Sequence, residues 1–324
     1  MGGRLHGLSP SVMNLAHVHL LLNHFPTIGM MVGLGVFIAA IIAKSDDLKR
    51  ASLIVFFGIA LLSIPTFASG TAAELALSKT PEVSKTMIEA HETAALVALG
   101  FMELTGALAW LGLWQYRRLS RLPQGTLLAI LLAGLLTFGL MGRAANIGGD
   151  IRHPEIRTGP VSADSAPAEP PLARVIGDAM VNLKWGWPAS ETAHFIGLCL
   201  LFGVVLVVDL RMLGFMKGIP FSTLHRLLPW GVLGFGVNVV TGILFFIGAP
   251  PDFYVNNPVF IWKLALILVA GANALYFTVF EHAWTLGAGD TPPMAAKVAA
   301  ASGILVWTGV IFCGQMLPFF GHSF

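Results

Sequence analysis

The sequence predicts an all-α, polytopic membrane protein with about eight transmembrane helices in two four-helix bundles. Of its 324 residues, 56% are hydrophobic and only 11% are charged, and the mean hydropathy is +0.77. Soluble domains usually carry about 25% charged residues. The apolar residues form runs of about 20, the length with which a helix crosses a bilayer. The expected spans are residues 17–43, 51–69, 91–116, 125–143, 191–213, 225–248, 259–281 and 297–320.

One polar segment separates these runs into two groups of four. Residues 144–189 are rich in proline, glycine and charged residues, and they are too polar to lie in lipid. We therefore expect an N-terminal four-helix membrane bundle in residues 1–143. A periplasmic connector would occupy residues 144–189, and a C-terminal four-helix membrane bundle would occupy residues 190–324.

Lysine and arginine residues in the short loops predict the orientation, because such residues concentrate on the cytoplasmic side. With the N-terminus outside, ten basic residues flank the spans on the inner side and three on the outer side, the long connector being left out. The inner set is Lys44, Lys49, Arg50, Arg117, Arg118, Arg121, Arg211, Lys217, Arg226 and Lys297, and the outer set is Arg4, Lys79 and Lys85. Both termini are expected outside, with the protein in a bacterial inner (cytoplasmic) membrane.

Most histidines then fall at or near the outer side. These are His6, His17, His19, His24, His91, His153, His194 and His322, whereas His225 and His282 fall near the inner side. Polar residues within a span are costly and usually face the bundle interior. The main chemistry is therefore expected at the periplasmic face.

The first span contains three histidines near its outer end. His17 and His24 are seven residues apart, nearly two helical turns, so a continuous helix would place them on one face and His19 away from both. Pro26 removes the donor that would bond the carbonyl of Leu22, which predicts a kink there. His17 and His24 are candidate metal ligands, and His24 would lie deeper.

His91 begins the third span, whose outer end can meet that of the first span. A histidine on each of two facing helices is how a bundle holds haem b between them. The sequence therefore favours His24 and His91 as one axial pair. Interfacial histidines in contact with water or lipid headgroups are the alternative.

His153 follows the fourth span, just after Gly148 and Gly149, which permit a close backbone turn. Arginines such as Arg143 and Arg152 flank it, and guanidinium groups match the geometry of haem propionates. His153 would be a haem ligand, a propionate partner or a solvated loop residue.

The second half contains His194 in the first turn of its first span, a candidate haem or metal ligand. Its partner is open, with His322, Met316 and a ligand from the first half as candidates. His225 and His282 lie at the inner ends of their spans and would bracket an inner cofactor site or serve as interface residues.

The two halves resemble two uncharacterised prokaryotic four-helix membrane families. The marks of the first half are His24-Phe25-Pro26, Gly148-Gly149 and Arg152-His153; those of the second are Glu191-Thr192-Ala193-His194-Phe195, Asp209-Leu210-Arg211 and Leu224-His225-Arg226. Such domains resemble membrane b-type cytochromes and tend to be paired with periplasmic redox proteins. The resemblance implies one or more haem b groups and a periplasmic c-type cytochrome or dehydrogenase subunit as partner.

Three functions are compatible with the sequence. The first is an electron-transfer subunit of an oxidoreductase complex, a membrane cytochrome b that links a periplasmic partner to the quinone pool or another membrane carrier. The second is a copper transporter or handling protein, because histidines and twelve methionines suit that metal. The third is a cofactor-free membrane anchor. No basic stretch indicates nucleic-acid binding.

Overall fold

The computed structural model describes residues 15–77, 84–152, 171–279 and 282–320, and within these ranges the chain is all-α with no strand. Eight of its helices are long and apolar enough to cross a membrane, which confirms the predicted fold class. They are α2 (His24–Ile42), α3 (Asp46–Leu77), α4 (Lys85–Leu119), α5 (Gln124–Arg152), α7 (Gly186–Leu213), α9 (Leu228–Gly248), α11 (Pro258–Val279) and α12 (Met294–Phe320).

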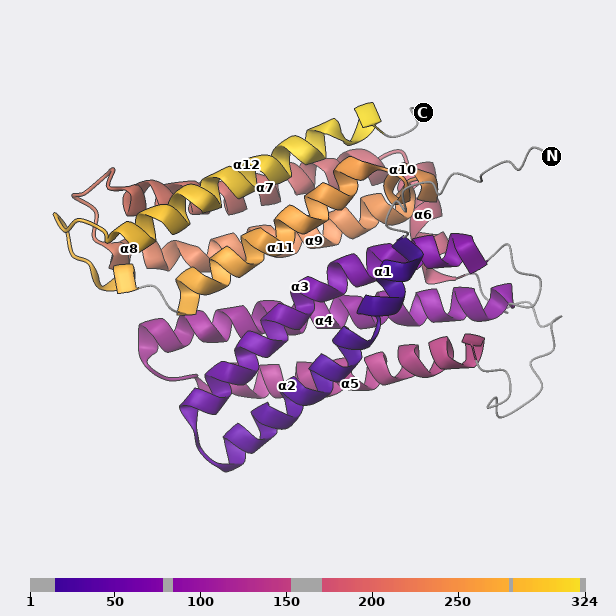
Figure 1. The fold of residues 1–324 in the computed structure, drawn as a ribbon, viewed down its shortest axis with the longest axis horizontal. Helices are drawn as coiled ribbons and strands as arrows, with labels where there is room; N and C mark the ends of the chain where they lie inside the picture. Colours follow the sequence, from indigo (N-terminus) through magenta and orange to yellow (C-terminus); the bar gives the residue numbers. More distant parts are fainter. Residues whose placement is uncertain (1–14, 78–83, 153–170, 280–281, 321–324) are drawn as a thin grey trace, which may run out of the picture.

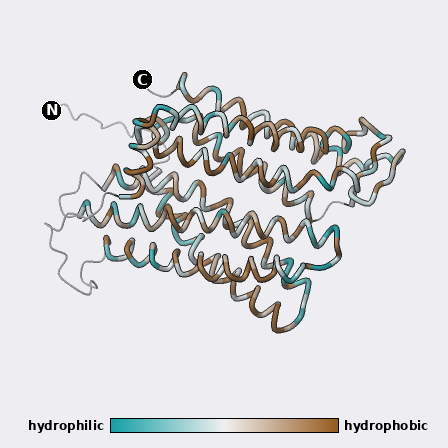
Figure 2. The backbone as a smooth tube through the Cα atoms, turned by 180° about the vertical axis from the view of Figure 1, so that it is seen from behind, coloured by the Kyte–Doolittle hydropathy of each residue, from teal (hydrophilic) through white to brown (hydrophobic). Residues whose placement is uncertain are grey.

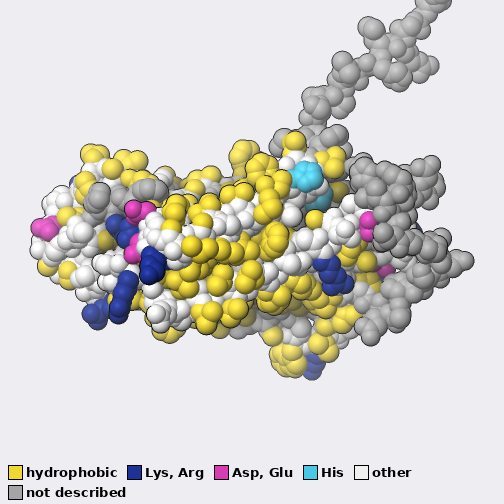
Figure 3. All heavy atoms as spheres, turned by 90° about the horizontal axis from the view of Figure 1, so that it is seen from below, with side chains coloured by type: hydrophobic (Ala, Val, Ile, Leu, Met, Phe, Trp, Pro, Cys, Tyr) yellow, Lys and Arg dark blue, Asp and Glu magenta, His cyan; other side chains and the backbone are white. Residues whose placement is uncertain are grey.

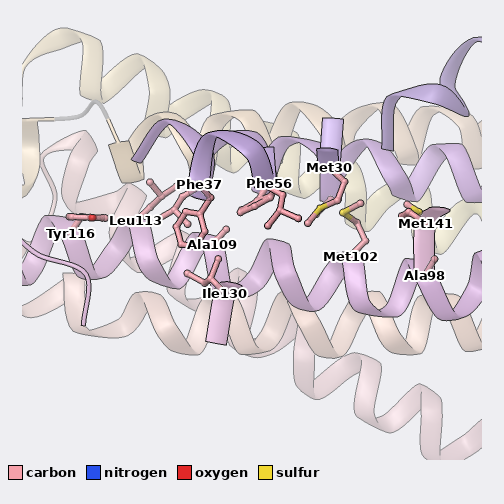
Figure 4. Close-up of a cluster of buried hydrophobic side chains, with 13 residues drawn as sticks. Met30, Phe37, Phe56, Ala98, Met102, Ala109, Leu113, Tyr116, Ile130 and Met141 are labelled. Carbon is pink, nitrogen blue, oxygen red and sulfur yellow. The ribbon is translucent and has the colours of Figure 1, made fainter. Parts of the chain in front are cut away.

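The first four of these helices form a bundle in which neighbours along the chain are neighbours in space. Helix α3 packs between α2 and α4, and α5 closes the bundle against α4 and α2 (Figure 1). Side chains from all four helices fill the interior, among them Met30, Phe37, Phe56, Met102 and Ile130 (Figure 4). Short loops join the helices, which favours this antiparallel arrangement.

The second half forms a layer beside this bundle. Helix α7 packs on α9 and α12, and α12 packs on α11 (Figure 1). Helices α9 and α11 also contact α4, so α7 and α12 lie on the side away from the first bundle. Shorter elements complete the fold: α1 (Leu15–Leu22), α6 (Leu172–Asn182), α8 (Phe221–Leu224), η2 (His225–Leu227), α10 (Pro251–Val255) and η3 (His282–Thr285).

Tryptophan hydrogen bonds join the two halves. The indole N–H of Trp110 on α4 donates to the Thr278 hydroxyl on α11 over 2.8 Å, and that of Trp114 donates to the carbonyl of His225 over 2.8 Å. Trp110 also packs with Phe57 and Leu61 in an apolar cluster to which α9 and α11 contribute. Both indole N–H groups therefore have acceptors inside the protein, as buried tryptophans usually do.

The surface pattern matches the predicted spans. Hydrophobic residues dominate the middle of the helices, and hydrophilic residues are more frequent toward their ends (Figure 2). On the face shown in Figure 3, an apolar band lies between a group of charged side chains at one end and histidines nearer the other. The basic residues of the predicted inner set all lie at or near the ends of helices on one side of the molecule. The side of the membrane that this end faces stays a prediction.

The first predicted span is broken in the structure. Helix α1 ends at Leu22 and α2 begins at His24, with Asn23 between them. Helix α1 runs in a different direction from α2 and packs on α3 (Figure 1). The kink predicted from Pro26 is therefore confirmed. The continuous-helix geometry assumed for His17, His19 and His24 is wrong, because the direction of the helix axis changes between the first two and the third.

Three helices contribute to the predicted connector: the end of α5, all of α6 and the first residues of α7. Helix α5 continues to Arg152, so the turn expected at Gly148 and Gly149 is wrong: both glycines lie within the helix. Helix α6 spans residues 172–182 and packs on α9. The period of its apolar residues is that of an amphipathic helix, a signal that the overall polarity of the segment obscures.

Helices α7 and α9 cross where Gly197 contacts Gly234, and a substitution there tests this close packing. A Cβ atom on Gly234 would lie 2.7 Å from the carbonyl oxygen of Gly197, a backbone atom that cannot rotate away. We expect Gly234→Ala to force the helices apart and to destabilise the protein by about 1–3 kcal/mol. The midpoint of unfolding in detergent measures this effect.

Gly236, two residues along the same helix, is the matched control. No atom lies within 4 Å of a Cβ placed there. Gly236→Ala should leave the unfolding midpoint unchanged or raise it, because alanine favours a helix. Equal destabilisation by both substitutions would contradict the described crossing.

Candidate functional site: a histidine pair at one end of the first bundle

The imidazole of His19 lies against α3. Its Nδ1 atom is 2.9 Å from the carbonyl oxygen of Thr66 and 3.2 Å from the Ser69 hydroxyl oxygen. The Ser69 hydroxyl itself donates to the Thr66 carbonyl over 2.8 Å, and a carbonyl oxygen has no proton to give. The hydrogen therefore resides on Nδ1 of His19, and its Nε2 atom carries the lone pair.

The imidazole of His91 is held in the same way by α5. Its Nδ1 atom is 3.0 Å from the carbonyl oxygen of Ala144, so Nδ1 again carries the hydrogen and Nε2 the lone pair. His91 lies near the start of α4 and is half-buried. A helix carbonyl therefore fixes both its tautomer and the orientation of its ring.

His19 lies against α3 and His91 against α5, at the same end of the first bundle. Within the described residues no hydrogen bond engages the Nε2 atom of either ring. A metal-binding histidine almost always donates its other ring N–H to a carbonyl, carboxylate or water, which orients the ring and raises its basicity. In both members of this histidine pair, Nδ1–H donates to a backbone carbonyl and Nε2 is free to bind a metal.

Two glycines make room for the rings. A Cβ atom on Gly70 of α3 would lie 3.3 Å from Cε1 of His19, and one on Gly148 of α5 would lie 3.0 Å from Cε1 of His91. Each imidazole therefore packs directly against a helix at a position without a side chain. Gly148 serves this contact and not the backbone turn that the sequence indicated.

His24 is not part of this arrangement. It is the first residue of α2, and its side chain is exposed on the surface of the protein. Because the chain changes direction at Asn23, α1 lies across α3. His19, on α1, is therefore the histidine that contacts α3. The predicted pair of His24 and His91 is replaced by His19 and His91.

His194 lies in a different environment from the histidine pair. Its Nδ1 atom is 2.7 Å from the Thr241 hydroxyl on α9, its ring contacts Phe245, and the ammonium of Lys263 on α11 lies within electrostatic range. Because α7 is on the side away from the first bundle, a ligand from the first half is disfavoured.

His225 is buried between two tryptophans. Its ring stacks on Trp114 at 5.8 Å and meets Trp284 edge-on at 4.6 Å, measured between ring centroids. Its Nε2 atom has no hydrogen-bond partner in the described part of the chain. Trp284 belongs to η3, which begins at His282. The role of His225 and His282 in an inner cofactor site stays a prediction. The side chain of His282 lies outside the described residues.

The remaining predicted site residues are placed only in part. Arg143 is exposed on α5, directly before Ala144. Arg152 is the last residue of α5 and His17 lies within α1, but the side chains of both are outside the description. His153 falls entirely outside the described residues. Their roles as propionate partners or ligands stay predictions.

The donor set of the histidine pair limits what it can bind. Among the described residues there is no group of three or more His, Cys, Asp and Glu that could hold a metal ion. Zinc and divalent copper sites usually have three or four protein ligands. Haem iron needs only two axial ligands, because the porphyrin supplies the other four, and two neutral imidazoles with free Nε2 atoms suit it.

Comparison with known proteins adds nothing to this geometry. No family model, no curated protein and no solved structure matches the chain. The resemblance to membrane b-type cytochromes therefore stays an expectation from the sequence motifs.

Sequence reasoning missed His19 because it assumed one uninterrupted helix. A kink near Pro26 rotates the residues before it relative to those after it, so the spacing along one straight helix does not predict which histidine faces the bundle interior. Gly70 is the residue that makes room for the His19 ring, and its pairing with His19 depends on how α1 packs on α3.

The contact between Gly148 and His91 can be tested directly. We expect Gly148→Ala to push the His91 ring away and to weaken its hydrogen bond to Ala144, because the new methyl group would lie 3.0 Å from Cε1. In spectra of the protein labelled with ¹⁵N-histidine, the Nδ1–H signal of His91 should shift or broaden. Gly149→Ala is the matched control, since no atom lies within 4 Å of its Cβ position. An unchanged His91 signal in Gly148→Ala would contradict the described contact.

Proposed function

We propose that the protein is a membrane-embedded b-type cytochrome subunit in which His19 and His91 are the axial ligands of one haem b. It would transfer electrons between a periplasmic c-type cytochrome or dehydrogenase subunit and the quinone pool or another membrane carrier. The observation that carries this proposal is the pair of imidazoles with carbonyl-bound Nδ1–H groups and free Nε2 atoms.

The chain's own residues supply the positioning. The carbonyls of Thr66 and Ala144 hold the two rings with Nε2 as the free donor atom. Hydrogen bonds of this kind raise ligand basicity, which favours the oxidised iron and lowers the reduction potential. When bound, the haem supplies one-electron chemistry that side chains do not provide.

The location of the pair fits this role. His19 and His91 lie toward the end of the bundle that the loop charges predict to be periplasmic, where a soluble redox protein can approach. Arg143, Arg152 and His153 would be the candidates for contact with the propionates. The inner membrane of a bacterium is the proposed location, with quinone as a further candidate partner.

The same geometry gives less support to the two other functions that the sequence suggests. A copper transporter needs a series of metal sites, and the described residues contain no group of three or more ligands. A cofactor-free anchor gives no role to two imidazoles that are each held with a free Nε2 atom. The absorption spectrum of the purified protein separates these functions, because only the cytochrome has an intense Soret band and a reducible α-band.

Substitution of the ligands tests the proposal. We expect His19→Ala and His91→Ala each to abolish or strongly reduce the Soret absorbance per protein, since either change removes one axial ligand. His24→Ala is the matched control, because this exposed histidine is the nearest along the chain to His19 and has no place in the pair. Its haem content should equal that of the unmodified protein.

Size-exclusion profiles and circular dichroism of each variant report whether the bundle still folds. Loss of haem in His24→Ala, with full haem content in folded His19→Ala, would contradict the proposed ligands. A colourless unmodified protein, after expression with sufficient haem, would contradict the function itself.

A further inference from the structure

A cavity of about 990 Å³ opens between the two halves, at the end of the molecule that also carries the histidine pair. Helices α3 and α4 of the first bundle, α6, and the adjoining ends of α7 and α9 form its walls. This volume is that of a pocket for a small organic molecule. The four described histidines at this end, His19, His24, His91 and His194, are not among its lining residues.

Aromatic side chains from three helices form the apolar part of the wall. They are Phe67 on α3, Trp187 on α7 and Phe246 on α9. Phe67 and Phe246 approach each other with ring centroids 6.2 Å apart, and Trp187 is braced by Phe245 at 5.1 Å. Rings fixed in this way present faces with negative potential, which attract cations.

Carboxyl groups from three helices form the polar part. Glu74 on α3, Glu92 on α4 and Asp178 on α6 line the cavity, together with a single guanidinium, that of Arg174. Arg174 is already engaged, since its Nη2 atom lies 2.7 Å from Oε1 of Glu89, which is not among the lining residues. The lining therefore contains three carboxyl groups and one guanidinium that is already paired.

Two of these carboxyl groups lack a partner of opposite charge. Neither Glu74 nor Glu92 forms an ion pair in the described part of the chain, and both side chains are half-buried. A bound cation would supply the missing opposite charge, which a partly buried carboxylate needs.

We propose that this cavity binds a monovalent organic cation with an apolar body, a quaternary ammonium or a protonated amine. The carboxylates of Glu74 and Glu92 would face the charge, and Phe67, Trp187 and Phe246 would pack on its alkyl or aryl groups. Aromatic walls combined with carboxylates are the usual chemistry for quaternary ammonium recognition.

Other ligand classes fit less well. A divalent metal ion prefers six or more oxygen ligands, and the described residues supply no cluster of three or more carboxylates for one. An anion would meet repulsion from three carboxylates, with the only lining guanidinium already paired. A neutral apolar molecule would fill the volume but would leave the charges of Glu74 and Glu92 without a counterpart.

Calorimetric titration with benzyltrimethylammonium tests the proposal on the full chain in detergent. We expect saturable binding that weakens as the salt concentration rises, because the attraction is partly electrostatic. The combined substitution Glu74→Gln and Glu92→Gln keeps the side-chain shapes but removes both charges. It should lower the affinity by about tenfold or more.

Two controls make the result specific. Asp47→Asn removes a carboxylate that is 96% exposed at the opposite end of the molecule, and it should leave the affinity unchanged. The uncharged isostere of the probe, with carbon in place of nitrogen, should bind the unmodified protein at least about tenfold more weakly. Circular dichroism and the unfolding midpoint confirm that each variant is folded.

Three results would overturn the proposal. They are equal affinity of the charged probe and its neutral isostere, unchanged affinity in the folded double variant, and no binding at millimolar concentration. None of these measurements depends on haem, so failure here leaves the proposed cytochrome function untouched, and failure of that function leaves this cavity as described.

Discussion

Hydrogen bonds from ring nitrogens to helix carbonyls determine how this protein presents its histidines. Both rings are half-buried, and a ring N–H group that is shielded from water needs an acceptor inside the protein. His19 finds the carbonyl of Thr66, and His91 finds that of Ala144. Each bond fixes a tautomer, turns the ring and leaves Nε2 as the free donor atom. The break at Asn23 and the glycines at positions 70 and 148 follow from the same requirement, because they allow the two rings to reach these carbonyls.

The eight spans were predictable because their signal is simple. Apolar runs of bilayer length separated by short polar loops specify a helical membrane protein, and the structure places a helix at each expected position. Helix α6 was not predicted because it is short and amphipathic. The polar residues around it make the average composition of the segment that of a loop. The continuation of α5 through Gly148 and Gly149 was missed because glycine lowers helix propensity in isolation, whereas packing against α4 outweighs that cost here.

The candidate site was predictable only in part, and for a geometric reason. The sequence indicated His91 because it lies near the start of a span, at the end predicted to be periplasmic. In the structure its ring is held by the carbonyl of Ala144. His19 was set aside because a straight helix would turn it away, and no sequence pattern states the angle at which a kinked segment continues. The cavity lined by Glu74 and Glu92 could not be predicted at all, since it depends on how the two halves and α6 pack together. Local sequence therefore determines the helices, and their packing determines the sites.

The central claim is that His19 and His91 hold one haem between them. A high-resolution structure of the full chain, purified from membranes of cells supplied with haem, tests it most directly. The account predicts planar porphyrin density whose iron is bonded to Nε2 of both histidines, with the Nδ1–H groups still on the carbonyls of Thr66 and Ala144. Porphyrin density bonded to other side chains, or side chains packed between the two rings in a haem-containing preparation, would contradict it.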